Sequence, residues 1–266
     1  MSGHPHAPLL RQVIAIVEDA GRTMILPAYQ SAVQRFNKAD GSLVTATDLA
    51  VQRQIQQQLH ELDATIAFLG EEMDEAAQLA CLRDSGGYYW CLDPLDGTTN
   101  FATSFPGFAT SLALIEDGVS VLACIHDPVR GETFTALRGA GARCNGEPIT
   151  ASTQQSLAKS VGFIDFKRLS AAHAERFVRN RLYRSQRNIG SCALEWAWLA
   201  AGRAQFVLHG GEKVWDFAAG SLLASEAGCQ VGDFSGAPFF PVRALASPVL
   251  AACSAPIHAA LQEHLR

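Results

Sequence analysis

The chain has 266 residues, of which 48% are apolar, and its formal net charge is -5. The apolar fraction is typical of a globular protein, and the length fits one large domain or two closely packed ones. The acidic balance argues against nucleic acid as a partner, because phosphate backbones are bound by basic surfaces. No apolar run reaches the roughly 18 residues that a membrane-spanning helix needs, so no contact with a membrane is expected.

The cysteines indicate the compartment. There are seven, they are scattered along the chain, and no two of them form a CxxC pair. An odd, dispersed set of this kind is neither a disulfide framework nor a zinc site. We therefore expect reduced, mostly buried thiols in a cytoplasmic protein.

The first half combines helices with strands. Apolar residues at three- and four-residue steps predict a helix over 9–36, which Pro27 is expected to kink or end, and the loop 37–42 follows. A second helix is predicted to begin at Thr45, because Asp48 completes a capping-box pattern. Strand-like runs follow at 65–69 and 88–92, each stopping at acidic residues, and antiparallel strands are expected within 109–137.

The second half alternates helices with short strands. The helices are predicted at 172–182, 192–201, 217–227 and 256–265, and the strands at 159–164, 204–208 and 248–252. This alternation indicates a second α/β layer system. No flexible linker separates the halves, so residues 1–148 and 149–266 are expected to form one integrated unit.

Three segments concentrate carboxylates next to predicted strand ends or helix starts: 70–72, 93–101 and 215–220. Carboxylates that converge from separate parts of a chain are what Mg²⁺ requires. In the second segment, a turn at Pro94 can aim Asp93 and Asp96 to one side, and the backbone N–H groups after Asp96 can hold a phosphate. The alternative is an ordinary Asp-Gly-Thr turn that caps a helix.

These segments resemble a known family. GEE (70–72), DPLDGTTNF (93–101) and WDFAAG (215–220) are similar to the signature blocks of the inositol monophosphatase family of Mg²⁺-dependent phosphatases, and VTATD (44–48) is similar to a fourth. The resemblance extends over roughly residues 10–260. It implies an α+β or α/β fold, the layered αβαβα sandwich of the sugar phosphatases, and a homodimer.

The resemblance also implies a metal site with two or three Mg²⁺ ions. In the family pattern Asp93 bridges two ions, while Asp96 and Asp216 belong mainly to the second ion. Acidic side chains and one backbone carbonyl supply the implied ligands: Glu71, Asp93, the carbonyl of Leu95, Asp96 and Asp216.

The same resemblance implies hydrolysis by a metal-activated water without a covalent intermediate. Asp48 and Thr98 orient that water and help to deprotonate it, and Glu72 supports the metal ligands. The N–H groups of Gly97 and Thr98 hold the phosphate, and Asp96 also lies next to the substrate. No GxSxG pattern offers a covalent serine nucleophile.

Substrate contacts are implied at two further places. Ser191 and Cys192 match a family turn that touches the substrate ring, although Ser191 as a simple helix cap explains the pattern equally well. His209 stands seven residues before Asp216, where the inositol phosphatases typically have Glu. A histidine changes the charge and the hydrogen bonding there, unless Glu212 compensates.

A basic pair follows the predicted strand 159–164. Lys167 and Arg168 could favour a second phosphate on the substrate, but the sequence alone favours a solvated charge cluster with Asp165.

These residues predict a phosphomonoesterase that acts on a small phosphorylated polyol, by default inositol 1-phosphate. Histidinol phosphate, fructose 1,6-bisphosphate and 3′-phosphorylated nucleotides are the alternatives that His209 keeps open. A non-catalytic regulatory protein on the same fold is the alternative from another class. A filled set of mutually repelling carboxylates argues against it, because such a set is costly without metal.

Overall fold

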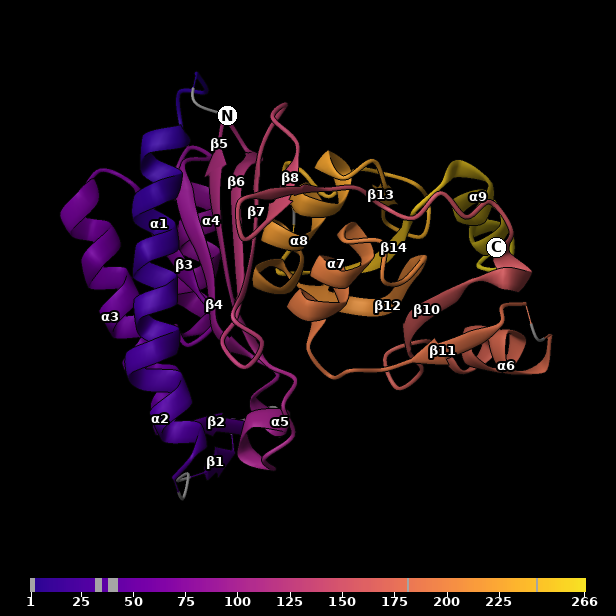
Figure 1. Cartoon of the computed structure of the whole chain (residues 1–266), viewed down its shortest axis with the longest axis horizontal. Coiled ribbons are helices and arrows are strands. Elements are labelled where there is room, and N and C mark those ends of the chain that lie inside the picture. The colour runs from indigo at the N-terminus through magenta and orange to yellow at the C-terminus, as the bar shows by residue number, and fades with distance from the viewer. Residues whose placement is uncertain (1–2, 32–34, 38–42, 181, 243) are drawn as a thin grey trace.

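The structure is a computed structural model that describes residues 3–31, 35–37, 43–180, 182–242 and 244–266. Five layers of helix and sheet alternate across the molecule (Figure 1). This arrangement confirms the predicted αβαβα sandwich. The first layer contains α1 (Ala7–Ala20), α2 (Leu26–Tyr29) and α3 (Ala46–Leu62), the middle layer contains α7 (Cys192–Ala200) and α8 (Val214–Glu226), and the last contains α6 (Ala171–Arg179) and α9 (Ala255–Glu263).

A seven-stranded sheet forms the second layer, with the strands in chain order from β3 to β9. All neighbours are antiparallel except β3 and β4, which are parallel. The parallel pair brings the two acidic segments that follow residues 69 and 92 to the same edge of the sheet. The strands are β3 (Ala67–Gly70), β4 (Tyr89–Asp96), β5 (Ala109–Glu116), β6 (Val119–Asp127), β7 (Glu132–Leu137), β8 (Ala142–Cys144) and β9 (Glu147–Ile149).

A five-stranded sheet forms the fourth layer, in the order β11-β10-β12-β14-β13. The first three strands in this order are parallel, so their carboxyl ends lie at one edge. The strands are β10 (Val161–Asp165), β11 (Ser185–Arg187), β12 (Phe206–Lys213), β13 (Gln230–Gly232) and β14 (Ala246–Ala252).

Shorter elements complete the description. A small sheet pairs β1 (Arg35–Asn37) with β2 (Leu43–Thr45), and two further helices are α4 (Glu75–Asp84) and α5 (Thr98–Ala102). A single 3-10 turn, η2 (Leu157–Lys159), precedes β10. Most of the predicted loop 37–42 lies outside the described residues. None of the described helices is both long and apolar enough to cross a membrane.

The first helix differs from its prediction over 9–36. It passes from α1 into a π-helical segment, η1 (Gly21–Ile25), then into α2, which ends at Tyr29. Pro27 lies in the first turn of α2, directly after the π-helical segment, and it has no N–H group to donate to the preceding turn. Strand β1 occupies 35–37, so the predicted helix over 9–36 was too long, while the expectation that Pro27 disturbs its last turns agrees with the end of α2 at Tyr29.

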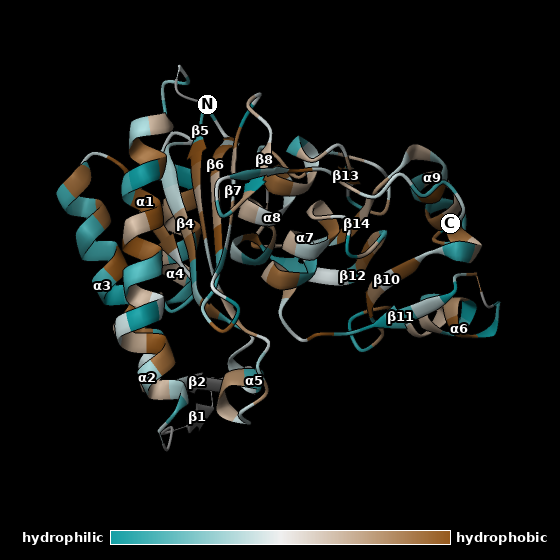
Figure 2. Ribbon diagram, viewed as in Figure 1, coloured by the Kyte–Doolittle hydropathy of each residue, from teal (hydrophilic) through white to brown (hydrophobic). Residues whose placement is uncertain are grey.

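Two apolar cores hold the layers together. One lies between α1, α3 and the seven-stranded sheet, and the other surrounds α7 and α8 between the two sheets. Figure 2 shows the apolar strands of the first sheet between these helical layers. Both sheets therefore pack against the middle layer, and this places the start of α8 beside the end of β4.

Candidate metal centre

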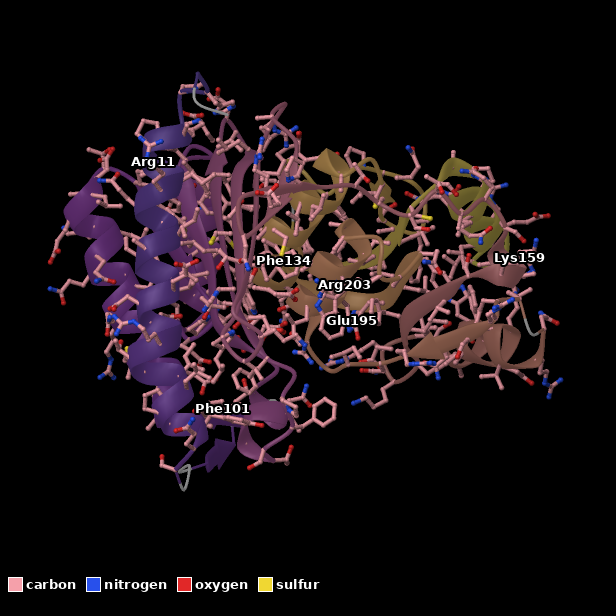
Figure 3. All side chains as sticks on the ribbon, in the orientation of Figure 1. Arg11, Phe101, Phe134, Lys159, Glu195 and Arg203 are labelled. Atoms are coloured by element: carbon pink, nitrogen blue, oxygen red, sulfur yellow. The ribbon has the colours of Figure 1, made fainter. Side chains whose placement is uncertain are left out.

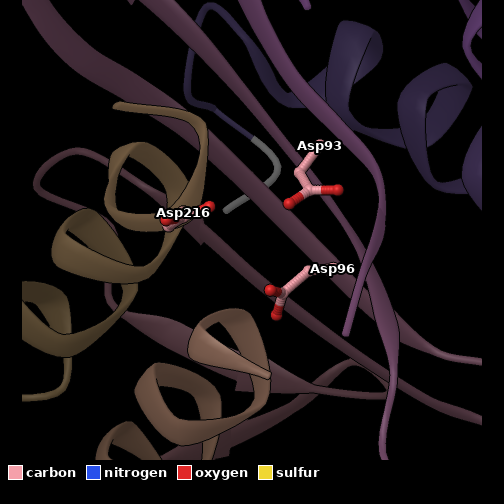
Figure 4. Close-up of side chains that lie close together, drawn as sticks. All are labelled: Asp93, Asp96 and Asp216. Atoms are coloured by element: carbon pink, nitrogen blue, oxygen red, sulfur yellow. The ribbon is translucent and has the colours of Figure 1, made fainter. Parts of the chain in front are cut away.

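Three aspartates converge at the junction of the first sheet and the middle layer. Asp93 and Asp96 come from β4, and Asp216 comes from the first turn of α8. One oxygen from each carboxylate lies within 4.8 Å of the other two, and Figure 4 shows the three side chains around a shared space. This spacing suits carboxylates that share cations.

An irregularity in β4 aims both of its aspartates to one side. The strand was expected to stop at Leu92, but it continues through the acidic segment, and its register against β5 shifts between Asp93 and Asp96. Pro94, which has no N–H group for the ladder, lies inside this shift. Asp93 Oδ1 accepts a hydrogen bond from the Leu95 N–H group at 3.0 Å. The shift thus turns two carboxylates toward the middle layer.

The start of α7 holds Asp96. Ser191 Oγ donates to Asp96 Oδ2 at 2.5 Å, and the backbone N–H group of Ala193 donates to the same oxygen at 2.7 Å. Ser191 also caps α7, because its Oγ accepts from the Leu194 N–H group at 3.4 Å. Ser191 is therefore both a helix cap and a contact of Asp96.

The first turn of α8 fixes Asp216. Its Oδ2 accepts from the Lys213 N–H group at 2.8 Å in a capping arrangement. Ser111 Oγ, on β5, donates to the carbonyl of Trp215 at 3.3 Å. These bonds attach the start of α8 to the sheet that carries the other two aspartates.

Burial and mutual repulsion disfavour the charged forms of these carboxylates. Burial, followed by the charges of Glu71, Asp96 and Asp216, raises the pKa of Asp93 well above its usual value. Burial raises the pKa of Asp96 to about 6 against the lowering effect of its bonds to Ser191 and Ala193. The pKa of Asp216 is also raised, again chiefly by burial. Bound cations would offset both the cost of burying these charged carboxylates and their mutual repulsion.

Glu71 and Glu72 follow β3 at the same edge. The Glu71 N–H group donates to the carbonyl of Leu92 at 3.0 Å, and a side-chain hydrogen bond joins Glu71 to Asp93. The Glu72 N–H group donates to Gln52 Oε1, on α3, at 2.9 Å. The structure thus brings Glu71 to the aspartate cluster and anchors the backbone of Glu72 beside it.

Asp48 and Thr98 form a pair next to the cluster. Thr98 Oγ1 lies 3.0 Å from Asp48 Oδ1 and 3.2 Å from the carbonyl oxygen of Leu95, and either can accept its proton. Asp48 Oδ2 accepts from the Thr45 N–H group at 2.9 Å and from its hydroxyl, which confirms the predicted capping box. Burial raises the pKa of Asp48, and these hydrogen bonds lower it. Both residues expected to orient water therefore lie together.

Gly97 begins the short helix α5. Its φ is +89°, and a Cβ atom at this position would lie 2.8 Å from the carbonyl oxygen of Gly107. Glycine is required here for both reasons. The turn at Gly97 separates the end of β4 from the start of α5. The first N–H groups of α5 have no partners within the helix.

The candidate substrate residues lie at the carboxyl ends of the parallel strands. Cys192 is the first residue of α7 and is partly exposed. His209 is 6% exposed and pairs in register with Asp165 of β10. Glu212, the residue that could compensate for His209, is fully buried, and its Oε2 accepts from Trp196 Nε1 at 2.8 Å.

Sequence reasoning missed several residues that shape this region. Glu195 lies buried in the middle layer (Figure 3), and its Oε1 accepts from the Ile189 N–H group at 2.7 Å. Asn100 Nδ2 donates to the carbonyls of Gly107 and Ile189, at 2.6 and 2.7 Å. A lone acid within the apolar run 192–200 was the available signal for Glu195.

The fold and this centre define the class of protein: an α/β sandwich with a largely buried acidic cluster suited to cations. The sequence model of the inositol monophosphatase family matches residues 8–266, and the chain belongs to this family. Inositol monophosphatase 1 of Solanum lycopersicum is 33% identical over 240 residues, which cover 86% of this chain and 87% of that protein. Nus factor SuhB of Escherichia coli K12 is 34% identical over 236 residues, or 86% of each chain.

Solved structures agree with the family assignment. The crystal structure of extragenic suppressor protein suhB from Bartonella henselae has a TM-score of 0.87 and 29% identity to this chain. The match covers 98% of this chain and 99% of that one. The likeness therefore includes all five layers and the junction where the aspartates meet.

Proposed function

We propose that the chain is a Mg²⁺-dependent phosphatase that hydrolyses a small phosphorylated polyol. The observation that carries this proposal is the cluster of Asp93, Asp96 and Asp216 within 4.8 Å, beside the hydrogen-bonded pair of Asp48 and Thr98. Clustered carboxylates of like charge are costly without cations. Family membership supports the same class of reaction.

The implied ligands fit this role. Glu71, Asp93, Asp96, Asp216 and the Leu95 carbonyl would hold two or three Mg²⁺ ions, since all are oxygen donors and the three aspartates already share one space. When bound, the ions would supply positive charge that neutralises the phosphate and lowers the pKa of water.

The chain's own groups would orient the reactants. When Thr98 donates to Asp48, a lone pair of Thr98 Oγ1 is left to accept a hydrogen bond from the attacking water. The N–H groups of Gly97 and Thr98 would hold the phosphate at the start of α5. Water attacks directly in this proposal, so no covalent intermediate forms on a side chain.

Inositol 1-phosphate is the default substrate within this proposal. Histidinol phosphate, fructose 1,6-bisphosphate and 3′-phosphorylated nucleotides remain alternatives because His209 replaces the usual glutamate. We also propose a homodimer, as the family resemblance implies, and a cytoplasmic location, with which seven free cysteines agree.

A regulatory role without catalysis is the second candidate. It is favoured by relatives named Nus factor SuhB, one of which, from Escherichia coli K12, is 34% identical to this chain. The presence of every implied ligand together with Asp48 and Thr98 favours hydrolysis.

The test is phosphate release from inositol 1-phosphate, histidinol phosphate, fructose 1,6-bisphosphate, glycerol 2-phosphate and adenosine 3′,5′-bisphosphate, with Mg²⁺ and with EDTA. We expect release that requires Mg²⁺. Thermal unfolding with and without Mg²⁺ runs in parallel, because a ligand that binds the folded state raises the melting temperature. Stabilisation by Mg²⁺ without release from any substrate would contradict the phosphatase proposal and favour the regulatory role.

A further inference from the structure

The edge of the second sheet that carries His209 also carries an unused basic pair. Strands β10, β11 and β12 are parallel, so they end at the same edge. The continuation of β12 leads to Asp216, and β11 leads to Ser191, so this edge is the one beside the metal centre. Ligands of α/β sheets bind outside the carboxyl ends of parallel strands. Lys167 and Arg168 follow the end of β10 at this edge.

The turn that carries the pair is fixed against β12. Asp165 Oδ1 accepts from the Lys167 N–H group at 2.9 Å, and the Asp165 carbonyl accepts from the Arg168 N–H group at 3.2 Å. A Cβ atom at Gly210 would lie 1.8 Å from the carbonyl oxygen of Arg168. Only glycine at position 210 allows this approach, which places the backbone of Arg168 directly beside the residue after His209.

The two cationic side chains are not used inside the protein. Both residues are exposed, and neither side chain has a hydrogen bond or ion pair within the described parts of the chain. Arg168 is close enough to the metal centre for its charge to lower the pKa of Asp216. Both cations also act on His209, whose pKa they help to lower.

His209 presents a neutral donor beside these cations. Its Nδ1 lies 3.1 Å from the Gly211 N–H group and accepts from it, which assigns the ring proton to Nε2. Nε2 lies 3.7 Å from Asp165 Oδ2, too far for a hydrogen bond. Asp165 is the acidic residue whose charge acts on His209, and its other oxygen accepts from the Lys167 N–H group. A glutamate in place of His209 would repel an anion that the histidine can bind.

We propose that Lys167, Arg168 and His209 bind a second oxyanion, which the substrate carries in addition to the phosphate that is hydrolysed. This inference rests on the proposed phosphatase function and narrows its substrate class. The sequence favoured a solvated charge cluster, but a solvated pair requires neither the close approach at Gly210 nor a place beside Asp216. The chemistry is shared by a second phosphate and a carboxylate.

Matched substrates test the inference and separate these two sources. Fructose 1,6-bisphosphate is compared with fructose 1-phosphate, and 2-phosphoglycerate with glycerol 2-phosphate. We expect the doubly anionic member of at least one pair to have a kcat/KM about tenfold higher or more, through a lower KM. The pair that shows the preference identifies the second group as phosphate or carboxylate.

Charge-removing variants locate the effect. Arg168→Gln and the double variant Lys167→Gln/Arg168→Gln should reduce the preference ratio about tenfold. Lys159→Gln is the matched control, because Lys159 is an exposed cation before the opposite end of β10 (Figure 3), and it should leave the ratio unchanged. Equal kcat/KM within both pairs, or equal effects of Arg168→Gln and Lys159→Gln, overturns the inference and leaves the phosphatase proposal standing. No Mg²⁺-dependent release from any of the four substrates overturns both.

Discussion

Asp48 combines a structural bond and a proposed catalytic one within a single carboxylate. Its Oδ2 caps α3 through the Thr45 N–H group, and its Oδ1 accepts from Thr98. Asparagine can keep one cap bond through its amide oxygen but cannot take up a proton. The two functions are therefore separable by substitution.

We expect Asp48→Asn to lower kcat by about 10²- to 10⁴-fold, the range of general-base catalysis. Its Mg²⁺ affinity should stay within about threefold, because Asp48 is not among the implied ligands. Steady-state kinetics and calorimetric Mg²⁺ titration measure the two effects. Asp74→Asn is the control, since Asp74 caps α4 through the Ala77 N–H group and lies outside the site. Near-normal turnover in Asp48→Asn would remove Asp48 from the proposed mechanism.

His209 makes stability depend on pH. Burial first, and then Arg168 and Lys167, lower its pKa from 6.5 to about 4, against the raising effect of Asp165. The unfolded chain therefore binds more protons than the folded chain between these values, and stability rises with pH through this window. Above pH 6.5 His209 is neutral in both the folded and the unfolded chain, so it no longer reduces stability.

The variant His209→Asn should show a flatter dependence of stability on pH between about 4 and 6.5. The difference from the natural chain amounts to about 3 kcal/mol across the window. Urea unfolding in EDTA at a series of pH values measures it. His126, whose pKa burial also lowers, is present in both proteins and cancels in the comparison. Parallel curves for the two proteins would show that His209 does not titrate in this window.

At the scale of elements, helix starts create the site. Ser191, which caps α7, donates to Asp96. Asp216 lies in the first turn of α8 and accepts from the N–H group of Lys213, the residue just before that helix. Asp96 thus depends on a cap that belongs to another layer. A cap of this kind should affect metal binding as well as stability.

We expect Ser191→Ala to cost about 1 kcal/mol of stability and to weaken Mg²⁺ binding about tenfold. Ser170→Ala is the matched control, because Ser170 caps α6 through the His173 N–H group at 3.2 Å. Its cost in stability should be similar, with no change in Mg²⁺ affinity. Thermal unfolding and calorimetric titration of both variants decide the point. Equal Mg²⁺ affinities would mean that Ser191 only caps α7.

Sequence patterns predicted those elements whose signals are local. Thr45 and Asp48 located the start of α3, because the capping box involves only neighbouring residues. The π-helical segment at Gly21 could not be predicted in this way. A Cβ atom at Gly21 would lie 2.7 Å from His126 Cδ2, so a contact with a distant strand accompanies this local change. The spacing of apolar residues in the first helix does not indicate the contact between Gly21 and His126.

At the scale of the whole molecule, the site depends on packing between layers. The acidic segments could be predicted as a metal site from the sequence, because their carboxylates followed predicted strands or opened predicted helices. The contact between His209 and Asp165 could not be predicted from the sequence, because it depends on the parallel register of β10 and β12. The buried bond from Trp196 to Glu212 likewise joins residues whose contact no local pattern indicates.

The two helices of the middle layer, α7 and α8, pack very closely against each other at Gly220. A Cβ atom at Gly220 of α8 would lie 2.3 Å from Trp196 Cγ of α7. Trp196 is fully buried and hydrogen-bonded to Glu212, so it cannot easily move aside. A larger residue at position 220 would force α7 and α8 apart.

We therefore expect Gly220→Ala to destabilise the protein by about 1–3 kcal/mol, the usual cost of overpacking. It should also weaken Mg²⁺ binding, because α8 carries Asp216 and the start of α7 holds Asp96. Gly211→Ala is the control, since no atom lies within 4 Å of a Cβ atom there, and its stability should change by no more than about 0.5 kcal/mol. Urea unfolding and Mg²⁺ titration of both variants measure the effects. If Gly220→Ala lost stability but kept its Mg²⁺ affinity, the spacing of α7 and α8 would stabilise the fold without setting the geometry of the metal centre.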